Sequence, residues 1–261
     1  MLGAIIGDIA GSIYEWDNHK SKDFQFLDPA CCPTDDSIMS LAVAKAIVEC
    51  NGDYSDFEEK CVVFMQMLGK KYPDAGYGGS FFRWIFADFP KAYGSWGNGS
   101  AMRVSPCGFA ASSLEEALTL AEKQASVSHD HPEGIKGAQA VAAAIYLAKT
   151  RHSKDEIRSY ITENFYELDF TLDEIREDYK FDVSCQGSVP QALEAFFESD
   201  GFEDAIRCAI SIGGDSDTIA AMTGGIAEAF YGIPEEIRKT ALTYLEIKQL
   251  EILYEFEKLF P

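Results

Sequence analysis

The sequence lacks the two features that would place it in a membrane or outside the cell. It has no run of about 18 or more uncharged apolar residues, which a transmembrane helix needs. The first residues reach an acid, Asp8, too soon for a secretory signal peptide. We therefore expect a cytoplasmic protein with no membrane partner.

Paired cysteines and positive charge are also scarce. The seven cysteines form no C-x-x-C pair, so no zinc or redox motif is indicated. Nothing near adjacent Cys31 and Cys32 would lower a thiol pKa, and we expect unreactive thiols there. With 22 basic and 43 acidic residues, the net charge of −21 disfavours nucleic acid as a partner. A small anionic ligand stays possible where backbone N–H groups or bound cations neutralise it locally.

Strand signals are missing as well, because no β-branched segment alternates with period two between hairpin-type turns. Apolar residues instead recur at helical spacing. The pattern predicts helices around 38–46 and 133–148, and also at 56–70, 79–87, 113–126, 154–164, 188–198, 202–211, 217–231 and 235–259. The loops between these predicted helices are short and rich in Gly, Pro and Asp. We expect one all-α domain over residues 1–261, since 47% hydrophobic residues can form a large core.

Two acidic clusters stand at predicted helix starts, Thr34-Asp35-Asp36-Ser37 and Gly213-Gly214-Asp215-Ser216-Asp217-Thr218. Each alone reads as an N-cap, since acids near the positive helix end are favourable. An EF-hand is excluded because Ile219 and Ile226 stand where oxygen ligands are needed. Together the clusters hold four carboxylates ahead of helices too apolar to be exposed, and buried like charges need cations. If the two starts meet, they would suit two hard divalent cations about 3.5–4 Å apart.

A third acidic segment lies near the N-terminus. Glycines 3, 7 and 11 fall on one helix face, which usually indicates close helix packing. Glu15 is expected to close this helix, either as a solvated end or as a general base or metal ligand.

Two glycine-rich segments, 76–79 and 94–100, allow backbone N–H groups to converge on an anion, although plain turns explain them equally well. His129 stands before Pro132, so a helix cap explains part of its segment. We favour a ribose or phosphate contact for His129 over a zinc pair with His131, because too few other ligands are available. No nucleophilic triad is evident, which leaves metal-assisted hydrolysis.

Taken in order, these segments resemble the ADP-ribosylglycohydrolase family, which includes dinitrogenase reductase-activating glycohydrolase and the ADP-ribosyl-acceptor hydrolases. The resemblance covers essentially the whole chain. It rests on Gly7-Asp8-x-x-Gly11-Ser12-x-Tyr14-Glu15, Thr34-Asp35-Asp36-Ser37, Gly76-Tyr77-Gly78, Gly97-Asn98-Gly99-Ser100-Ala101-Met102-Arg103, Ser128-His129 and Gly213-Gly214-Asp215-Ser216-Asp217-Thr218.

The resemblance implies an orthogonal helical bundle with a binuclear Mg²⁺ or Mn²⁺ centre at the bottom of a cleft. It implies six metal ligands: Thr34, Asp35, Asp36, Asp215, Asp217 and Thr218. Glu15, with Asp35 and Asp36, would be catalytic, Glu15 by ligating an ion or activating water. The substrate-binding residues would be Gly76, Tyr77, Gly78, Ser95, Trp96, Gly97, Asn98, Gly99, Ser100 and His129.

The implied activity is metal-dependent removal of ADP-ribose from a modified protein or a small ADP-ribosyl compound. Residues 151–182 carry no family motif, so the acceptor stays open, with arginine-linked ADP-ribose favoured over serine-linked. The alternative is a catalytically inactive, metal-dependent ADP-ribose-binding module. For the last predicted helix, core packing is favoured over a dimer surface, and the oligomeric state stays open.

Overall fold

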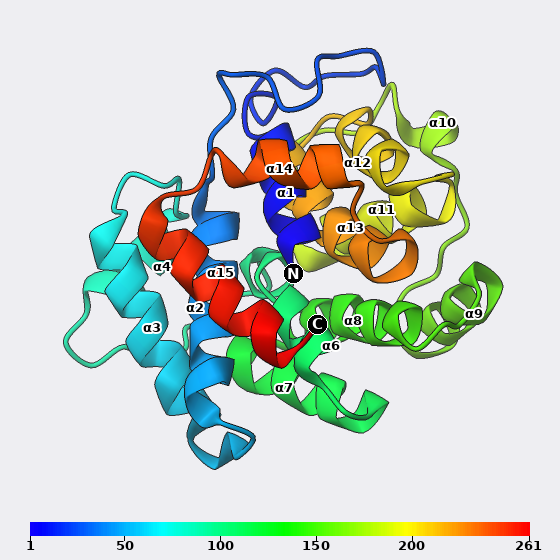
Figure 1. Ribbon diagram of the computed structural model, residues 1–261. Coiled ribbons are helices and arrows are strands. Elements are labelled where there is room, and N and C mark those ends of the chain that lie inside the picture. Colours follow the sequence, from blue (N-terminus) through cyan, green and yellow to red (C-terminus); the bar gives the residue numbers. More distant parts are fainter.

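Two helices that are far apart in the sequence lie at the centre of the fold. The computed structural model describes residues 1–261, and α1 (Leu2–Gly11) and α13 (Ser216–Tyr231) pack side by side within it (Figure 1). Every residue of α1 is buried. The chain forms fifteen α-helices and no strand, which confirms the predicted all-α class.

The other helices surround this pair. The first group contains α2 (Asp35–Cys50), the 3₁₀ turn η1 (Tyr54–Asp56), α3 (Phe57–Lys71), α4 (Gly79–Phe86) and α15 (Ile247–Leu259). The middle of the chain forms α5 (Gly99–Met102), α6 (Ser105–Ala110), α7 (Leu114–Ser126), α8 (Pro132–Lys149) and α9 (Lys154–Asn164). The remaining helices are α10 (Leu172–Ile175), α11 (Cys185–Phe197), α12 (Phe202–Ile210) and α14 (Glu235–Leu242). In Figure 1, α3 and α4 lie at the opposite side of the molecule from α9 and α10.

The glycine face of α1 explains how closely the central helices approach. The backbones of Gly3 and Gly224 meet, and a Cβ atom at Gly7 would collide with the carbonyl group of Ala220. At the other end of α1, a Cβ atom at Gly11 would lie 2.5 Å from the Cα atom of Asp217. The predicted close packing is therefore confirmed, with α13 antiparallel to α1. One consequence is that the end of α1 lies directly beside the start of α13.

The last predicted helix is in fact two helices, α14 and α15, so the single helix over 235–259 was wrong. The chain turns at Thr243, whose hydroxyl donates to the carbonyl of Thr240. A capping box then starts α15, because the backbone N–H of Glu246 donates to the side chain of Gln249. The apolar periodicity runs through both helices and hides this break. α15 packs against α2 and buries Ile252, Leu253 and Phe256, as the core-packing interpretation expected.

The predicted end of the first helix was also wrong. α1 ends at Gly11, and residues 12–18 form turns, so Glu15 lies beyond the helix rather than at its end. The backbone N–H of Tyr14 donates to the carbonyl of Gly11 in the first of these turns. None of the fifteen helices combines the length and the apolar composition that a membrane crossing requires.

The glycine face gives a stability prediction. Gly7→Val should lower the free energy of unfolding by about 3 kcal/mol or more, because the new side chain would force α1 and α13 apart. Gly201→Thr is the matched control, since Thr is similar in size to Val and about as favourable as Gly at this N-cap, the φ of −178° suits any residue, and no atom lies within 4 Å of a Cβ there. Urea unfolding would measure both, and equal losses would contradict this view of the interface.

Candidate functional site

The site is assembled around Asp8, a fully buried carboxylate on α1. Its oxygens accept hydrogen bonds from the backbone N–H groups of Thr34, at 2.9 Å, and Ser37, at 3.0 Å. The hydroxyl groups of the same two residues also donate to Asp8. These four bonds attach the start of α2 to α1, and the local cause is the set of free N–H groups that every helix start presents. Burial raises the pKa of Asp8 to about 6, although the hydrogen bonds oppose the rise.

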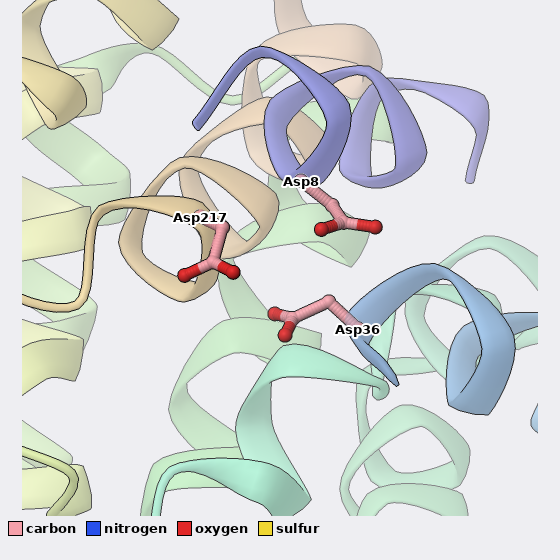
Figure 2. A group of neighbouring side chains, drawn as sticks. All are labelled: Asp8, Asp36 and Asp217. Carbon is pink, nitrogen blue, oxygen red and sulfur yellow. The ribbon is translucent and has the colours of Figure 1, made fainter. Parts of the chain in front are cut away.

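The two acidic clusters, some 180 positions apart, meet beside this residue. Thr218 donates through its hydroxyl to Asp36 at 3.2 Å. Carboxylate oxygens of Asp8, Asp36 and Asp217 all lie within 4.8 Å of one another. Figure 2 shows these three side chains directed toward a common space from α1, α2 and α13. The starts of α2 and α13 therefore face each other across the site.

A second acidic group adjoins the first. Carboxylate oxygens of Glu15, Asp215 and Asp217 also lie within 4.8 Å of one another, so Asp217 belongs to both groups. The side-chain amide of Asn98 donates to Asp215 at 2.7 Å and orients it. Two adjacent groups that share one carboxylate can hold two neighbouring cations.

The raised pKa values of these carboxyl groups are also what a cation-binding site would produce in the absence of its cations. Burial, followed by the nearby charge of Asp8, raises the pKa of Asp35 to about 8. Burial and neighbouring carboxylates raise the pKa of Asp36 and of Asp217 well above the usual range. Glu15 is half-buried, and burial together with the charge of Asp215 raises its pKa to about 7. Several ionised carboxylates cannot share so small a volume unless positive charge balances them.

One atom supports a hard cation in particular. The Oδ1 oxygen of Asp36 is buried and has no hydrogen-bond partner. A buried carboxylate oxygen without a donor is costly, and a divalent cation that prefers oxygen ligands would satisfy it. The residues present therefore fit Mg²⁺ or Mn²⁺ better than zinc, for which His or Cys ligands would be expected.

Above the acids lies a cleft of about 730 Å³. It is lined by most residues that the sequence predicted: Glu15, Asp35, Asp36, Gly76, Tyr77, Gly78, Ser95, Trp96, Gly97, Asn98, Gly99, His129, Asp215, Asp217 and Thr218. The loop before α4, the loop before α5 and the start of α13 thus face one cavity. Its size suits a small organic ligand that reaches down to the acids.

Two predicted site residues do not line the cleft. The hydroxyl of Thr34 donates to Asp8 at 2.6 Å, so its side chain is directed toward Asp8 on α1 and does not line the cavity. Ser100 is fully buried, and its hydroxyl donates to the carbonyl of Gly134 at 2.7 Å, away from the cavity. α5 turns the Ser100 side chain toward α8, and a role of Ser100 in ligand binding stays a prediction.

Two further predictions, for His131 and for the Cys31 thiol, agree with the structure. His131 caps α8 by accepting from the backbone N–H of Glu133, ahead of Pro132 at the helix start, as the cap interpretation expected. Burial raises the pKa of the Cys31 thiol to about 11, which agrees with an unreactive thiol.

Sequence reasoning missed several residues of the site. Asp8 had a usable signal, since it is the one acid in the apolar, glycine-containing segment Leu2–Gly11. Arg103 also lines the cleft, and its place at the end of the motif Gly97–Arg103 was a usable signal. Phe81 and Phe181 line the cleft as well, but nothing in the sequence sets them apart from core or surface residues.

Comparison with known proteins identifies the family. A family model described as ADP-ribosylglycohydrolase matches residues 1–259. ADP-ribosylhydrolase ARH3 of Bos taurus is 25% identical, over 94% of this chain and 88% of that protein. ADP-ribosylarginine hydrolase Tri1 of Pseudomonas putida (strain GB-1) is 30% identical, over 56% of this chain and 42% of that protein.

The fold is shared with a solved structure described as an ADP-ribosylglycohydrolase-related protein complex. The TM-score is 0.66 at 20% sequence identity, and the match covers 100% of this chain and 97% of that one. Because the family model spans almost the whole chain and the helical fold agrees, the protein belongs to the ADP-ribosylglycohydrolase family.

Proposed function

We propose that this protein is an enzyme that hydrolyses the bond between ADP-ribose and an acceptor, with two divalent cations, Mg²⁺ or Mn²⁺, bound at the acidic clusters. Family membership supports hydrolytic removal of ADP-ribose. The observation that carries the cation part is the pair of adjoining carboxylate groups that share Asp217. Six residues would hold the ions: Asp35, Asp36, Asp215, Asp217, Thr218 and Thr34, whose hydroxyl oxygen donates its hydrogen to Asp8 and keeps lone pairs for a cation.

The cations would supply positive charge that polarises the ribose hydroxyl groups and offsets the carboxylates around them. The protein's own part is to place the reacting carbon. Asp8 holds the start of α2, and Asn98 orients Asp215, so the carboxylates have little freedom to move. Fixed ligands of this kind reduce the reorganisation that the reaction requires.

Glu15 is the proposed acid–base group. It lies in the turns after α1, lines the cleft and adjoins Asp215 and Asp217. Its carboxylate can take a proton from the attacking water and return one to the leaving group. In its ionised form it would also stabilise the positive charge that develops on the ribose ring.

The remaining loops are suited to the rest of ADP-ribose. Glycines 76, 78, 97 and 99 expose backbone groups to the cleft, and Trp96 offers a half-exposed aromatic face beside them. Converging N–H groups suit a diphosphate, and an aromatic face suits a base or a sugar.

For the acceptor we propose an arginine side chain. Trp16 and Phe181 stack on each other at the edge of the cleft, with ring centroids 5.0 Å apart and planes inclined by 20°. Trp16 is 79% exposed and directly follows Glu15. A planar guanidinium group can stack on such a face while nearby carboxylates attract its charge. The name of the Tri1 relative, an ADP-ribosylarginine hydrolase, supports the same choice.

Asp217→Asn tests the reaction. Release of ADP-ribose from arginine-linked and serine-linked peptides should fall by about a thousandfold or more, because both carboxylate groups lose their shared member. Addition of EDTA to the wild-type protein should have a similar effect. Asp169→Asn, at an exposed position outside the cleft, is the matched control and should keep full activity. Unchanged ADP-ribose release by Asp217→Asn would contradict the proposal. Metal-dependent binding of ADP-ribose without any release by the wild-type protein would instead favour the inactive binding module.

The cation site also predicts how stability depends on pH. The folded-state pKa values of Asp8, about 6, and Asp35, about 8, lie above the unfolded value of 3.8. The folded state therefore binds more protons than the unfolded state in this range, and the free energy of unfolding of the metal-free protein should fall as pH rises from about 5 to about 8. Mg²⁺ or Mn²⁺ should remove most of this decline. Thermal melting in EDTA and in metal measures both slopes, and identical slopes would contradict a cation at these residues.

The arginine acceptor is tested with Trp16→Ala. KM for an arginine-linked substrate should rise about tenfold, the effect of one lost cation–π contact, while affinity for free ADP-ribose stays unchanged. Phe89→Ala is the control, because Phe89 is 88% exposed but lies outside the cleft. An unchanged KM, or an equal effect on a serine-linked substrate, would argue against arginine at this edge.

A further inference from the structure

The wall of the ligand cleft contains a buried cation that has no carboxylate partner. Arg103 follows α5, is fully buried and takes part in none of the ion pairs of the structure. Its guanidinium group lies 5.2 Å from the ring centre of Phe81. It donates from Nε to the side chain of Gln124 at 2.8 Å, and from Nη2 to the carbonyl of Gln124 at 3.0 Å. A buried guanidinium held by neutral acceptors alone is expensive, so a specific role should explain it.

The remaining bond of Arg103 leads to the cleft. Nη2 also donates to the hydroxyl oxygen of Ser128 at 2.9 Å, and that oxygen lies 2.8 Å from Nδ1 of His129. Ser128 is fully buried, and its hydroxyl has no partner besides these two. Arg103, Ser128 and His129 therefore form a linear relay from the core to the cavity wall.

The positions of the hydrogens in this relay follow from counting donors. A guanidinium group can only donate, so the Ser128 oxygen accepts from Arg103 and keeps one hydrogen of its own. If Nδ1 of His129 also carried a hydrogen, the Ser128 oxygen would face two donors, and its own hydrogen would be buried without an acceptor. Such an unsatisfied group costs about 1–3 kcal/mol. The hydroxyl of Ser128 therefore donates to Nδ1, which must be unprotonated.

The other ring nitrogen then carries the proton. Burial, with a smaller contribution from the charge of Arg103, holds the pKa of His129 well below its usual range, so the ring is neutral. Its Nε2 atom faces the turn at Gly97 and Gly99, at 3.6 Å and 3.0 Å from the places where Cβ atoms of these residues would stand. A side chain at Gly99 would therefore crowd the space in front of this N–H group.

We propose that Arg103 and Ser128 are positioning residues that lock His129 as the neutral tautomer protonated at Nε2, and that this N–H group donates to an anionic oxygen of the ligand above the Gly97–Gly99 turn. The tautomer is independent of the proposed function. Only the source of the oxygen, a phosphate group of ADP-ribose, rests on it. The fixed tautomer allows a strongly acidic cleft to present an N–H donor to an anion.

The free protein provides the first test. Long-range ¹H–¹⁵N spectra of ¹⁵N-labelled protein distinguish protonated from unprotonated ring nitrogens, and loss of signals in His129→Gln assigns them among the four histidines. We expect Nδ1 of His129 to be unprotonated and Nε2 protonated. A proton on Nδ1, or on both nitrogens at neutral pH, would overturn the lock. This test needs no variant of the relay that might fail to fold.

Addition of ADP-ribose with Mg²⁺ provides the second test. The Nε2 nitrogen and its proton should shift more than Nδ1 on binding. Binding seen by calorimetry with Nε2 unmoved would overturn the donor role. If calorimetry detects no binding of ADP-ribose at all, the proposed function fails and the donor role to its phosphate fails with it, while the lock is judged on the free-protein spectrum.

Variants separate positioning from general stability. Ser128→Ala should allow both tautomers and weaken ADP-ribose binding about tenfold, the effect of losing one well-placed bond to a charged group. Ser128→Thr keeps the hydroxyl and should restore the wild-type spectrum. Ser199→Ala, which removes another buried serine hydroxyl far along the chain, is the control and should change neither readout. A wild-type tautomer and wild-type affinity in Ser128→Ala would refute the relay.

Discussion

The structure depends on the burial of like charges where three helices meet. Asp8, Asp36 and Asp217 come from α1, α2 and α13, and their oxygens share one small volume. The protein offsets part of this repulsion itself, because the starts of α2 and α13 both point their partial positive charges at the site. Four hydrogen bonds donated to Asp8 also stabilise its negative charge. The raised pKa of Asp36 and its unpartnered oxygen indicate that these groups balance only part of the negative charge, and the proposed cations would balance the rest.

Close helix packing makes this arrangement possible. Because Gly3, Gly7 and Gly11 lack side chains, α1 can lie directly on α13, and the end of the glycine face touches Asp217 itself. Asp8 follows Gly7 and points to the side, toward α2, where it holds the start of that helix. The same short helix thus sets the distance to α13 and the position of α2. Residues 2–11 therefore determine both the packing of the core and the geometry of the site.

The sequence predicted those parts of the molecule that local physics determines. Helix starts at Asp35 and Ser216, the glycine face and the two acid clusters all follow from capping, periodicity and charge. The break at Thr243 was missed because the apolar periodicity continues through both helices and hides the local capping box at Glu246, while a tertiary contact, the hydroxyl of Tyr244 donating to the carbonyl of Leu27, also holds the turn. The Trp16–Phe181 stack and the environment of Arg103 were missed because each joins segments whose approach no local pattern encodes.

Groups of both charges line the cleft. Buried acids come from α2 and α13, whereas Arg103, which follows α5, is a buried cation with no anion paired to it. The Gly97–Gly99 turn and His129 line the cavity together with Arg103. A ligand that carries hydroxyl groups and, further along, a diphosphate would satisfy both kinds of charge in a single orientation. ADP-ribose has this order of groups, so under the proposed function the charges of the cleft would set its direction and place the anomeric carbon beside Glu15.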